Sequence, residues 1–245
     1  MLIDVIVSTA EAAQYSMQNY STIVVIDVLR ATSVIVTALS HGAKGVYPVV
    51  EVDAARELAA VWQHPAVLLG GERNAIPLPG FDLGNSPLEY TPEKVQGHDI
   101  IMTTTNGTKA IQAASVAKRV LVGALLNAKA IACALQHDEQ VALLCAGTYQ
   151  RLDIPDLLAA GAIIAALGEL GMNPQLNDLG RVSAEYFAKD SFKQRALHSY
   201  HGNMLAGLGR QEDLDYCLQL DTLAIVPRME QDGNLLRISC LEVQA

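Results

Sequence analysis

Apolar and polar residues follow one another in a repeated order along most of the chain. Short apolar runs rich in Val and Ile, such as residues 24–26, end in a polar turn, and a segment with helical spacing of its apolar residues follows. This order is typical of parallel strands that alternate with helices. We therefore expect a three-layer α/β/α fold with a largely parallel sheet and repeated βα units.

The last part of the chain departs from this order. Residues 177–220 have helical spacing, with a break near residues 207–209. Residues 223–226 and 235–239 fit the two strands of a hairpin, because a turn signal of Asp followed by Gly lies between them. The sequence thus predicts a helical C-terminal part and a terminal hairpin.

Length and composition limit the kinds of protein that this chain can be. With 245 residues, 51% of them hydrophobic, residues 1–245 can form a single domain with a large core, and two sublobes that meet near residues 95–100 are the alternative. A net charge of -9 without a cluster of Lys and Arg argues against binding to nucleic acid or an anionic membrane. No signal peptide or membrane span is recognised, so we expect a cytoplasmic protein. A homodimer is left open.

The polar turn after residues 24–26 contains the residue types best suited to bind a ligand. The sequence IDVLRATS at residues 26–33 places Asp27, Arg30 and Thr32 at the carboxyl end of a predicted strand, where ligands bind in open α/β sheets. A carboxylate suits a metal ion, and an arginine beside free backbone N–H groups suits a phosphate. A salt-bridged Asp-Arg pair with a hydroxyl helix cap is the structural alternative.

A long irregular segment follows a short strand predicted at residues 66–69. It begins with GGERN at residues 70–74 and runs through GFDLGNSP at residues 80–87. Its candidate site residues are Glu72, Arg73, Asp82, Asn85 and Ser86. Such long irregular segments in compact domains are usually functional, so we expect an active-site lid or binding loop. The alternative is a loop at the edge of the domain whose polar residues serve only as caps.

The sequence pattern of the turn at Asp27 recurs 76 residues later in the chain, so that Thr108 corresponds to Thr32. Residues 25–32 and 101–108 both contain an apolar strand, a polar turn, a small residue and a threonine before a helix. Because parallel strands deliver their loops to the same edge, we expect both turns to bind one anion. The candidate phosphate-binding residues are Arg30, Thr32, Asn85, Ser86, Thr104, Thr105, Asn106, Gly107, Thr108, and, from a weaker third copy, Gly147 and Thr148.

Taken together, these polar segments resemble the 2-phosphosulfolactate phosphatase family. The segments that carry the resemblance are residues 26–33, 70–74, 80–87, 103–108 (TTTNGT) and 144–148 (LCAGT). The resemblance implies a cytoplasmic, Mg²⁺-dependent acid phosphatase that hydrolyses 2-phosphosulfolactate, a small anionic phosphomonoester, to sulfolactate and phosphate, a step towards coenzyme M. One departure is Ala75, where the family has a glycine.

The residue types fit the chemistry that the resemblance implies. We expect Asp27, Glu72 and Asp82 to hold Mg²⁺, because this hard cation takes carboxylate oxygens and keeps several waters. We expect Arg30 and Arg73 to clamp the phosphoryl group or the other anionic groups of the substrate. Asp27, Arg30, Glu72 and Arg73 are therefore the candidates for catalysis.

Other mechanisms remain open at this stage. Haloacid-dehalogenase phosphatases also place an aspartate after an apolar strand, but they need a second acid where this chain has Leu29. Cys145 and Arg151 have the spacing of cysteine phosphatases, although Leu144 replaces their histidine, and a packed thiol is expected. His201 can be a proton donor, but a capping or core role is favoured. A non-catalytic binder of a phosphorylated hydroxy acid is the alternative to an enzyme.

Overall fold

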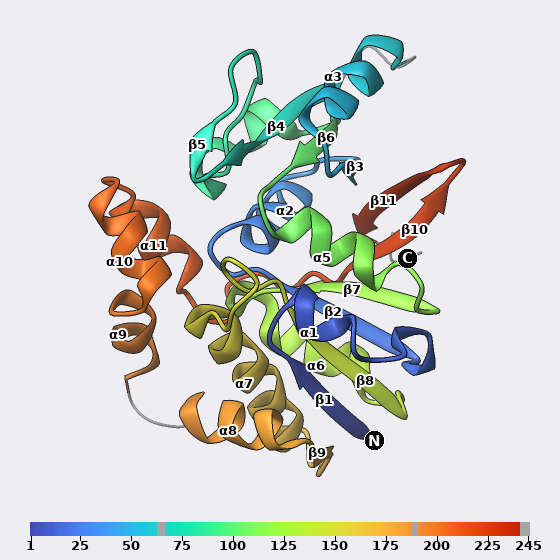
Figure 1. Ribbon diagram of the computed structural model, residues 1–245, viewed down its shortest axis with the longest axis vertical. Coiled ribbons are helices and arrows are strands. Elements are labelled where there is room, and N and C mark those ends of the chain that lie inside the picture. Colours follow the sequence, from blue (N-terminus) through green and yellow to red (C-terminus); the bar gives the residue numbers. More distant parts are fainter. Residues whose placement is uncertain (63–66, 188–190, 241–245) are drawn as a thin grey trace.

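The computed structural model describes residues 1–62, 67–187 and 191–240. Within these ranges the strands form one sheet with helices on both faces, and the chain ends in helices and a hairpin (Figure 1). The predicted α/β architecture, with a largely parallel sheet, a helical C-terminal part and a terminal hairpin, is confirmed.

Two groups of parallel strands make up most of the sheet. The first group consists of β3 (Gly45–Pro48), β6 (Asp99–Thr103) and β4 (Val67–Arg73), with the short β5 (Ile76–Pro77) antiparallel to the end of β4. The second group consists of β7 (Arg119–Gly123), β2 (Thr22–Ile26), β8 (Gln140–Cys145), β1 (Leu2–Ile6) and β9 (Gln175–Leu176). In Figure 1 the first group lies in the upper part of the view and the second group in the lower part.

A C-terminal hairpin joins the two groups. Its strands are β10 (Pro227–Asp232) and β11 (Leu235–Cys240); β10 pairs with β7, and β11 pairs with β3. The complete strand order is β5-β4-β6-β3-β11-β10-β7-β2-β8-β1-β9. The first hairpin strand begins after the predicted residues 223–226. The backbone N–H of Leu223 is instead bonded to the carbonyl oxygen of Leu126, at 2.9 Å.

The two parallel groups run in opposite senses along the sheet, since three antiparallel pairings (β3 with β11, β11 with β10, β10 with β7) separate them. The turns after β2 and β6 nevertheless meet. Their contact is shown by Gly107, where an added Cβ atom would lie only 2.5 Å from the Cβ of Ala31. Right-handed twist accumulates from strand to strand and rotates the groups away from a flat antiparallel arrangement. The predicted meeting of the turns is thus observed, but a shared parallel edge is not its cause.

Helices cover both faces of the sheet. They are α1 (Thr9–Ala12), α2 (Ala31–Ser40), α3 (Val52–Val61), α4 (Pro92–Val95), α5 (Gly107–Ala114), α6 (Ala128–Leu135) and α7 (Ile154–Glu169), with single 3₁₀ turns η1 (Met17–Asn19), η2 (Pro87–Glu89) and η3 (Leu125–Asn127). In β2, Ile23 and Val25 pack with α2 and α5, whereas Val24 and Ile26 pack with α6 and α7. Burial on both faces explains the unbroken apolar run of this strand.

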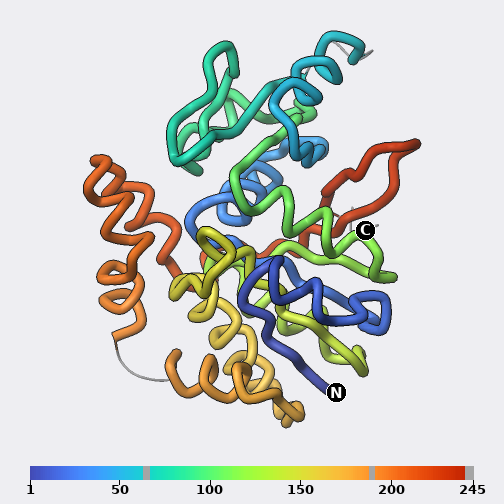
Figure 2. Tube along the Cα trace, in the orientation of Figure 1, coloured from blue at the N-terminus to red at the C-terminus, as the bar shows by residue number. Residues whose placement is uncertain are grey.

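In the described residues between β9 and the hairpin the chain forms four helices. They are α8 (Asp178–Phe187), α9 (Phe192–Leu197), α10 (Tyr200–Gly207) and α11 (Gln211–Cys217), and the break between α10 and α11 falls where the sequence predicts it. Helix α8 packs along α7. Figures 1 and 2 show α10 and α11 beside the turn that follows β2, and an ion pair between Arg30 and Asp213 joins them there.

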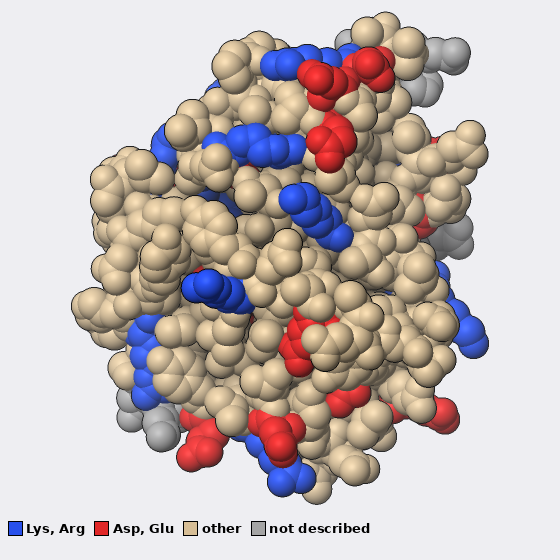
Figure 3. All heavy atoms as spheres, viewed as in Figure 1, with Lys and Arg blue, Asp and Glu red and all other residues tan. Residues whose placement is uncertain are grey.

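Charged side chains of both signs are spread over the face of the molecule drawn in Figure 3. On the face drawn in Figure 3, Lys and Arg side chains lie apart from one another, and several Asp and Glu side chains lie along the lower edge, so no continuous basic patch covers this face. Among the helices of the described ranges, none is both long and apolar enough to cross a membrane.

Candidate active site

A pocket opens at the junction where the turns after β2, β4, β6 and β8 meet α10. Its wall is formed by Asp27, Leu29, Arg30, Glu72, Asn74, Ala75, Asn85, Thr105, Asn106, Thr148, Tyr149, His201, Met204 and Leu205. The predicted site residues in this wall are Asp27, Arg30, Glu72, Asn85, Thr105, Asn106 and Thr148. The predicted site residues outside it are Thr32, Arg73, Asp82, Ser86, Thr104, Gly107, Thr108 and Gly147.

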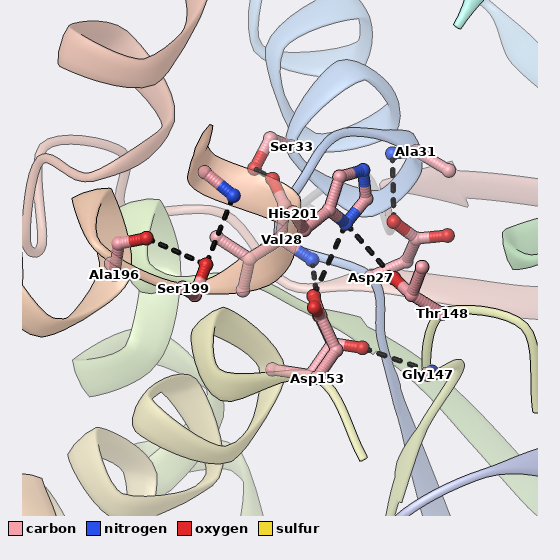
Figure 4. Close-up of polar contacts among 12 residues, drawn as sticks. Asp27, Val28, Ala31, Ser33, Gly147, Thr148, Asp153, Ala196, Ser199 and His201 are labelled. Atoms are coloured by element: carbon pink, nitrogen blue, oxygen red, sulfur yellow. Dashed lines mark hydrogen bonds and ion pairs between the residues drawn. The ribbon is translucent and has the colours of Figure 1, made fainter. Parts of the chain in front are cut away.

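Asp27 stands directly after β2, and the first turn of α2 fixes it there. Its backbone N–H donates to Oγ1 of Thr32 (2.9 Å), and the same hydroxyl donates to the carbonyl oxygen of Asp27 (2.8 Å). Its carboxylate Oδ1 accepts a long hydrogen bond from the N–H of Ala31 (3.3 Å; Figure 4). Burial raises the pKa of Asp27 to about 6. The charge of nearby His201 lowers this pKa, whereas the charge of nearby Asp153 raises it. The carboxylate is therefore suited to take up a cation or a proton.

Arg30 supplies positive charge to the pocket wall. Its side chain is buried, and Nη1 forms an ion pair with Oδ2 of Asp213 in α11. The other carboxylate oxygen of Asp213 accepts a hydrogen bond from Oγ of Ser86. The salt bridge considered from the sequence, between Asp27 and Arg30, is not formed; Arg30 pairs with an acid that lies much later in the chain.

Glu72 joins the end of β4 to the turn after β6. Its Oε1 accepts from the backbone N–H of Thr105 (2.8 Å), and its Oε2 accepts from the N–H of Ala75 (2.7 Å) and the hydroxyl of Thr105 (3.1 Å). Strand β4 runs to Arg73, past its predicted end at residue 69, because β6 and β5 pair with these additional residues. The longer strand carries Glu72 directly into the pocket wall.

The loop after Glu72 has a backbone conformation that favours glycine at Ala75, the position where the sequence departs from the pattern expected of the family. Asn74 and Ala75 both have left-handed backbone conformations, with φ of 53° and 63°. Glycine adopts this conformation at the lowest cost, whereas alanine adopts it with some strain. The N–H of Ala75 still reaches Glu72, so the loop keeps its anchor despite the substitution.

Arg73 does not reach the pocket wall. Its guanidinium donates to the carbonyl oxygens of Glu72 (2.8 Å) and Val50 (2.5 Å), and to the hydroxyl of Thr103 (2.8 Å). These bonds tie β4 to β6 and to the loop before α3. The side chain proposed as a substrate clamp thus holds the framework of the site.

Asp82 is also separated from the other two predicted metal ligands. Its exposed carboxylate accepts a hydrogen bond from the backbone N–H of Leu69 (2.9 Å) and does not line the pocket. The structure therefore brings Asp27 and Glu72 to one pocket without Asp82. Across residues 1–62, 67–187 and 191–240, no three Asp, Glu, His or Cys side chains are grouped so as to hold a metal ion.

The predicted likeness of the turns after β2 and β6 extends to their hydrogen bonds. Oγ1 of Thr108 accepts from the N–H of Thr104 (3.3 Å) and donates to its carbonyl oxygen (3.0 Å), as Thr32 does with Asp27. Thr104 in turn accepts from the N–H of Thr108 (3.1 Å). Both threonine hydroxyls are buried outside the pocket wall, so they stabilise the turns themselves.

Gly107 allows the two turns to touch. A Cβ atom at this position would lie 2.5 Å from the Cβ of Ala31 and 2.8 Å from Oδ2 of Asp27. The close approach of the turns therefore requires a residue without a side chain. As a consequence, Asn106 and Arg30 lie in the wall of the same pocket, beside the amino-termini of α5 and α2.

Asp156 connects the turn after β2 to the turn after β8. Its buried carboxylate accepts from the backbone N–H of Val28 (2.8 Å) and from that of Gly147 (3.1 Å). The N–H of Gly147 is therefore used inside the framework and is not directed at a ligand. The sequence indicates Asp156 only as part of a helix start, because its partners lie in the turns after β2 and β8, two strands that become neighbours only in the fold.

Replacing Asp156 with asparagine is expected to destabilise the protein. Asparagine offers one acceptor oxygen and one NH₂ group, so one of the two backbone N–H groups would face another donor. A buried donor without a partner costs about 1–3 kcal/mol. Burial raises the pKa of Asp156 well above its usual value, so the variant and the wild type are compared at acidic pH, where the carboxyl carries no charge and the substitution removes none. Urea unfolding measures this loss, with Asp53→Asn at an exposed site of α3 as the control. Equal stability of Asp156→Asn and the wild type would contradict the proposed connection.

His201 projects from α10 into the pocket wall, where Asp153 and Thr148 hold its ring (Figure 4). Nδ1 lies 3.0 Å from Oγ1 of Thr148 and 3.3 Å from Oδ2 of Asp153. Burial lowers the pKa of His201, but the hydrogen bond and charge of Asp153 outweigh it, and the pKa is raised. The sequence favours a capping or core role for this residue, whereas the structure gives it a place in the candidate site.

The cysteine alternative loses support from the geometry. Cys145 is buried at the end of β8 and does not line the pocket, and burial raises the pKa of its thiol well above the usual value. Arg151 is exposed and also lies outside the wall. A buried thiol with a raised pKa is a poor nucleophile, as the sequence analysis expects for a packed cysteine.

The comparisons with known proteins identify the class of the enzyme, a phosphoric monoester hydrolase. The family described as 2-phosphosulpholactate phosphatase matches residues 7–232. The chain belongs to the 2-phosphosulfolactate phosphatase family, in agreement with the resemblance seen in its polar segments.

Similar proteins from several bacteria carry the same name, probable 2-phosphosulfolactate phosphatase. The protein of Caldanaerobacter subterraneus subsp. tengcongensis is 44% identical over 213 residues, which cover 85% of this chain and 87% of the relative. That of Symbiobacterium thermophilum is 45% identical over 207 residues, 83% and 89% of the two chains. That of Clostridium novyi is 40% identical over 233 residues, 93% and 96% of the two chains.

Proposed function

We propose that this enzyme hydrolyses 2-phosphosulfolactate to sulfolactate and phosphate with the help of Mg²⁺, a step of the kind that leads to coenzyme M. The observation that carries the proposal is the pocket in which Asp27, Arg30 and His201 converge beside two helix amino-termini. Family membership and the names of the relatives support the choice of substrate.

The anionic substrate meets positive charge on one side of the pocket. Arg30 donates through its guanidinium, and the first N–H groups of α5 at Asn106 and Gly107 lack partners within the helix. Together they can bind phosphoryl oxygens, since helix amino-termini attract anions. The side-chain amide of Asn106 in the wall offers a further hydrogen bond to the carboxylate or sulfonate of the substrate.

The opposite charge in the wall suits a divalent cation. Asp27 and Glu72 both line the pocket, and the charge of Glu72 contributes to the raised pKa of Asp27. Oδ1 of Asn85, in the same wall, is buried without a hydrogen-bond partner in the described part of the chain. Carboxylate and amide oxygens fit Mg²⁺, which is held by one or two carboxylates and waters, so Asp27 and Asn85 would hold it with Glu72 beside them. The ion would neutralise charge on the phosphoryl oxygens.

His201 completes the proposed reaction by giving a proton to the leaving group. Water attacks phosphorus, the bond between phosphorus and the substrate's C2 oxygen breaks, and Nε2 of His201 protonates the departing alkoxide. Asp153, at Nδ1, keeps the ring oriented and favours its charged form. Arg30 and the amino-terminus of α5 hold the phosphoryl group during the transfer.

The function is tested by phosphate release from 2-phosphosulfolactate at steady state, with Mg²⁺ and with EDTA. We expect turnover with Mg²⁺ and little without it. The matched substrate is 2-phospholactate, which has the same phosphoester and carboxylate but no sulfonate, and we expect a lower kcat/KM for it. Absence of turnover on 2-phosphosulfolactate would contradict the proposed substrate. Turnover that EDTA does not affect would contradict the proposed use of Mg²⁺.

Replacing His201 with glutamine is expected to lower kcat for 2-phosphosulfolactate by about 10²–10⁴-fold, the usual contribution of a general acid. Glutamine keeps a polar side chain but has no proton to give. With 4-nitrophenyl phosphate, whose leaving group departs as a stable anion, the variant should lose much less. An equal loss with both substrates would show that His201 does not act as the acid.

A further inference from the structure

Resting on the function proposed above, we propose that Asp213 is a positioning residue that orients Arg30 towards the anionic substrate. Asp213 lies in α11, separated in the chain from every strand-end turn of the site. It does not belong to the pocket wall, whereas Arg30 does. Asp213 therefore acts on the substrate through Arg30 and not by contact.

The ion pair between Arg30 and Asp213 is enclosed. Only 3% of the Arg30 side chain and 4% of the Asp213 side chain is exposed. An arginine side chain has many rotamers, and a carboxylate bonded to one Nη atom restricts the side chain to the few that keep this contact. In the described part of the chain the guanidinium of Arg30 makes no other hydrogen bond, so its remaining N–H groups are available to the pocket.

The same carboxylate also anchors the loop after β5. Its Oδ1 accepts from Oγ of Ser86, and Ser86 is adjacent to Asn85, which lines the pocket with its unbonded Oδ1. Helix α11 itself is held against η2 and against α2, where the hydroxyl of Tyr216 lies 3.2 Å from that of Thr37. Asp213 thus fixes Arg30 and the loop carrying Asn85 relative to one another.

Two roles for Asp213 predict effects of opposite sign. If Asp213 only cancelled the charge of Arg30, removing its charge would leave the guanidinium uncompensated and anions would bind more tightly. If Asp213 orients the guanidinium, removing its charge would release the side chain into other rotamers and anions would bind more weakly. Anion affinity therefore separates positioning from neutralisation.

The test uses Asp213→Asn, which keeps the shape of the side chain and removes its charge. Titration calorimetry with inorganic phosphate should give a Kd raised about tenfold, the effect of losing a well-oriented charged hydrogen bond. KM for 2-phosphosulfolactate should rise by a similar factor, and kcat should change less than about threefold. Asp215→Asn, an exposed site on the same helix with the same change of charge, should leave both constants unchanged.

A Kd for phosphate that is unchanged or lower in Asp213→Asn would overturn the proposal. If that variant does not fold, Ser86→Ala provides the test, because it leaves the ion pair and removes only the second hydrogen bond. It should raise KM about threefold, and an unchanged KM would overturn the proposal as well. The phosphate titration needs no turnover. If the Kd for phosphate depends on Asp213 in a protein that does not hydrolyse 2-phosphosulfolactate, the proposed function is refuted but the positioning role of Asp213 is not.

Discussion

Replacing Asp27 with asparagine is expected to lower kcat for phosphate release by about 10²–10⁴-fold. The two side chains have nearly the same shape, but asparagine lacks the negative charge that the proposed Mg²⁺ site requires. The Mg²⁺ concentration needed for half-maximal activity should rise at the same time. Phosphate release measured over a series of Mg²⁺ concentrations checks both effects, and an unchanged titration would make Asp27 a structural residue only.

The same substitution should stabilise the metal-free protein at neutral pH. Burial raises the pKa of Asp27 from 3.8 to about 6, so the folded state disfavours the charged carboxylate. Stability of the wild type is therefore lost as the pH rises through this range, because the folded state binds the proton more tightly than the unfolded state. Asparagine avoids this loss. Thermal unfolding in EDTA should give Asp27→Asn the higher Tm at pH 8, and the difference should shrink as the pH falls towards 4.

Replacing Gly107 with alanine is the second change with a large expected effect. The added methyl group would lie 2.5 Å from the Cβ of Ala31 and 2.8 Å from Oδ2 of Asp27, so the two turns would have to move apart. Overpacking of this kind costs about 1–3 kcal/mol of stability. The displacement reaches the carboxylate and the amino-terminus of α5 together, so kcat/KM should fall at least about tenfold.

A glycine in open space provides the control for this variant. Gly168, in α7, has no atom of the protein beyond the adjacent backbone of its own helix within 4 Å of the position of an added Cβ. Alanine is the better helix former, so Gly168→Ala should leave activity unchanged and raise the Tm slightly. Normal stability and kcat/KM in Gly107→Ala would mean that the turns are free to separate, and their contact would then have no part in the site.

The fold and the part of the site at the strand ends could be predicted, because both depend on the order of apolar and polar residues over short segments of the chain. An apolar run that ends in a polar turn and a helix start gives Asp27, Arg30 and Asn106 their places without knowledge of the rest of the chain. The length of β4 could not be predicted in this way. Its two glycines favour a turn, but pairing with β6 extends the strand, and at Gly71 an added Cβ would lie 1.9 Å from the carbonyl oxygen of Thr103.

The remaining part of the site depends on contacts between distant segments. Asp156, His201 and Asp213 lie on helices whose sequences look like ordinary amphipathic or buried helices, and Asp153 directly precedes one of them. Each acquires its role from a partner on another element, such as Thr148 for His201. Arg73 and Asp82 illustrate the opposite case, since their residue types suit a phosphate and a metal but the backbone takes up their hydrogen bonds. Side-chain type alone cannot distinguish these outcomes.

The position of the hairpin has a consequence for how the chain reaches this structure. Among the strands of the described residues, β10 and β11 come last along the chain but lie between β3 and β7 in the sheet. Until they are in place, β3 and β7 each present an unpaired edge, and such edges invite pairing with other chains. On a ribosome the sheet can close only when its last strands have emerged, so a chain with this order is exposed to aggregation for most of its synthesis.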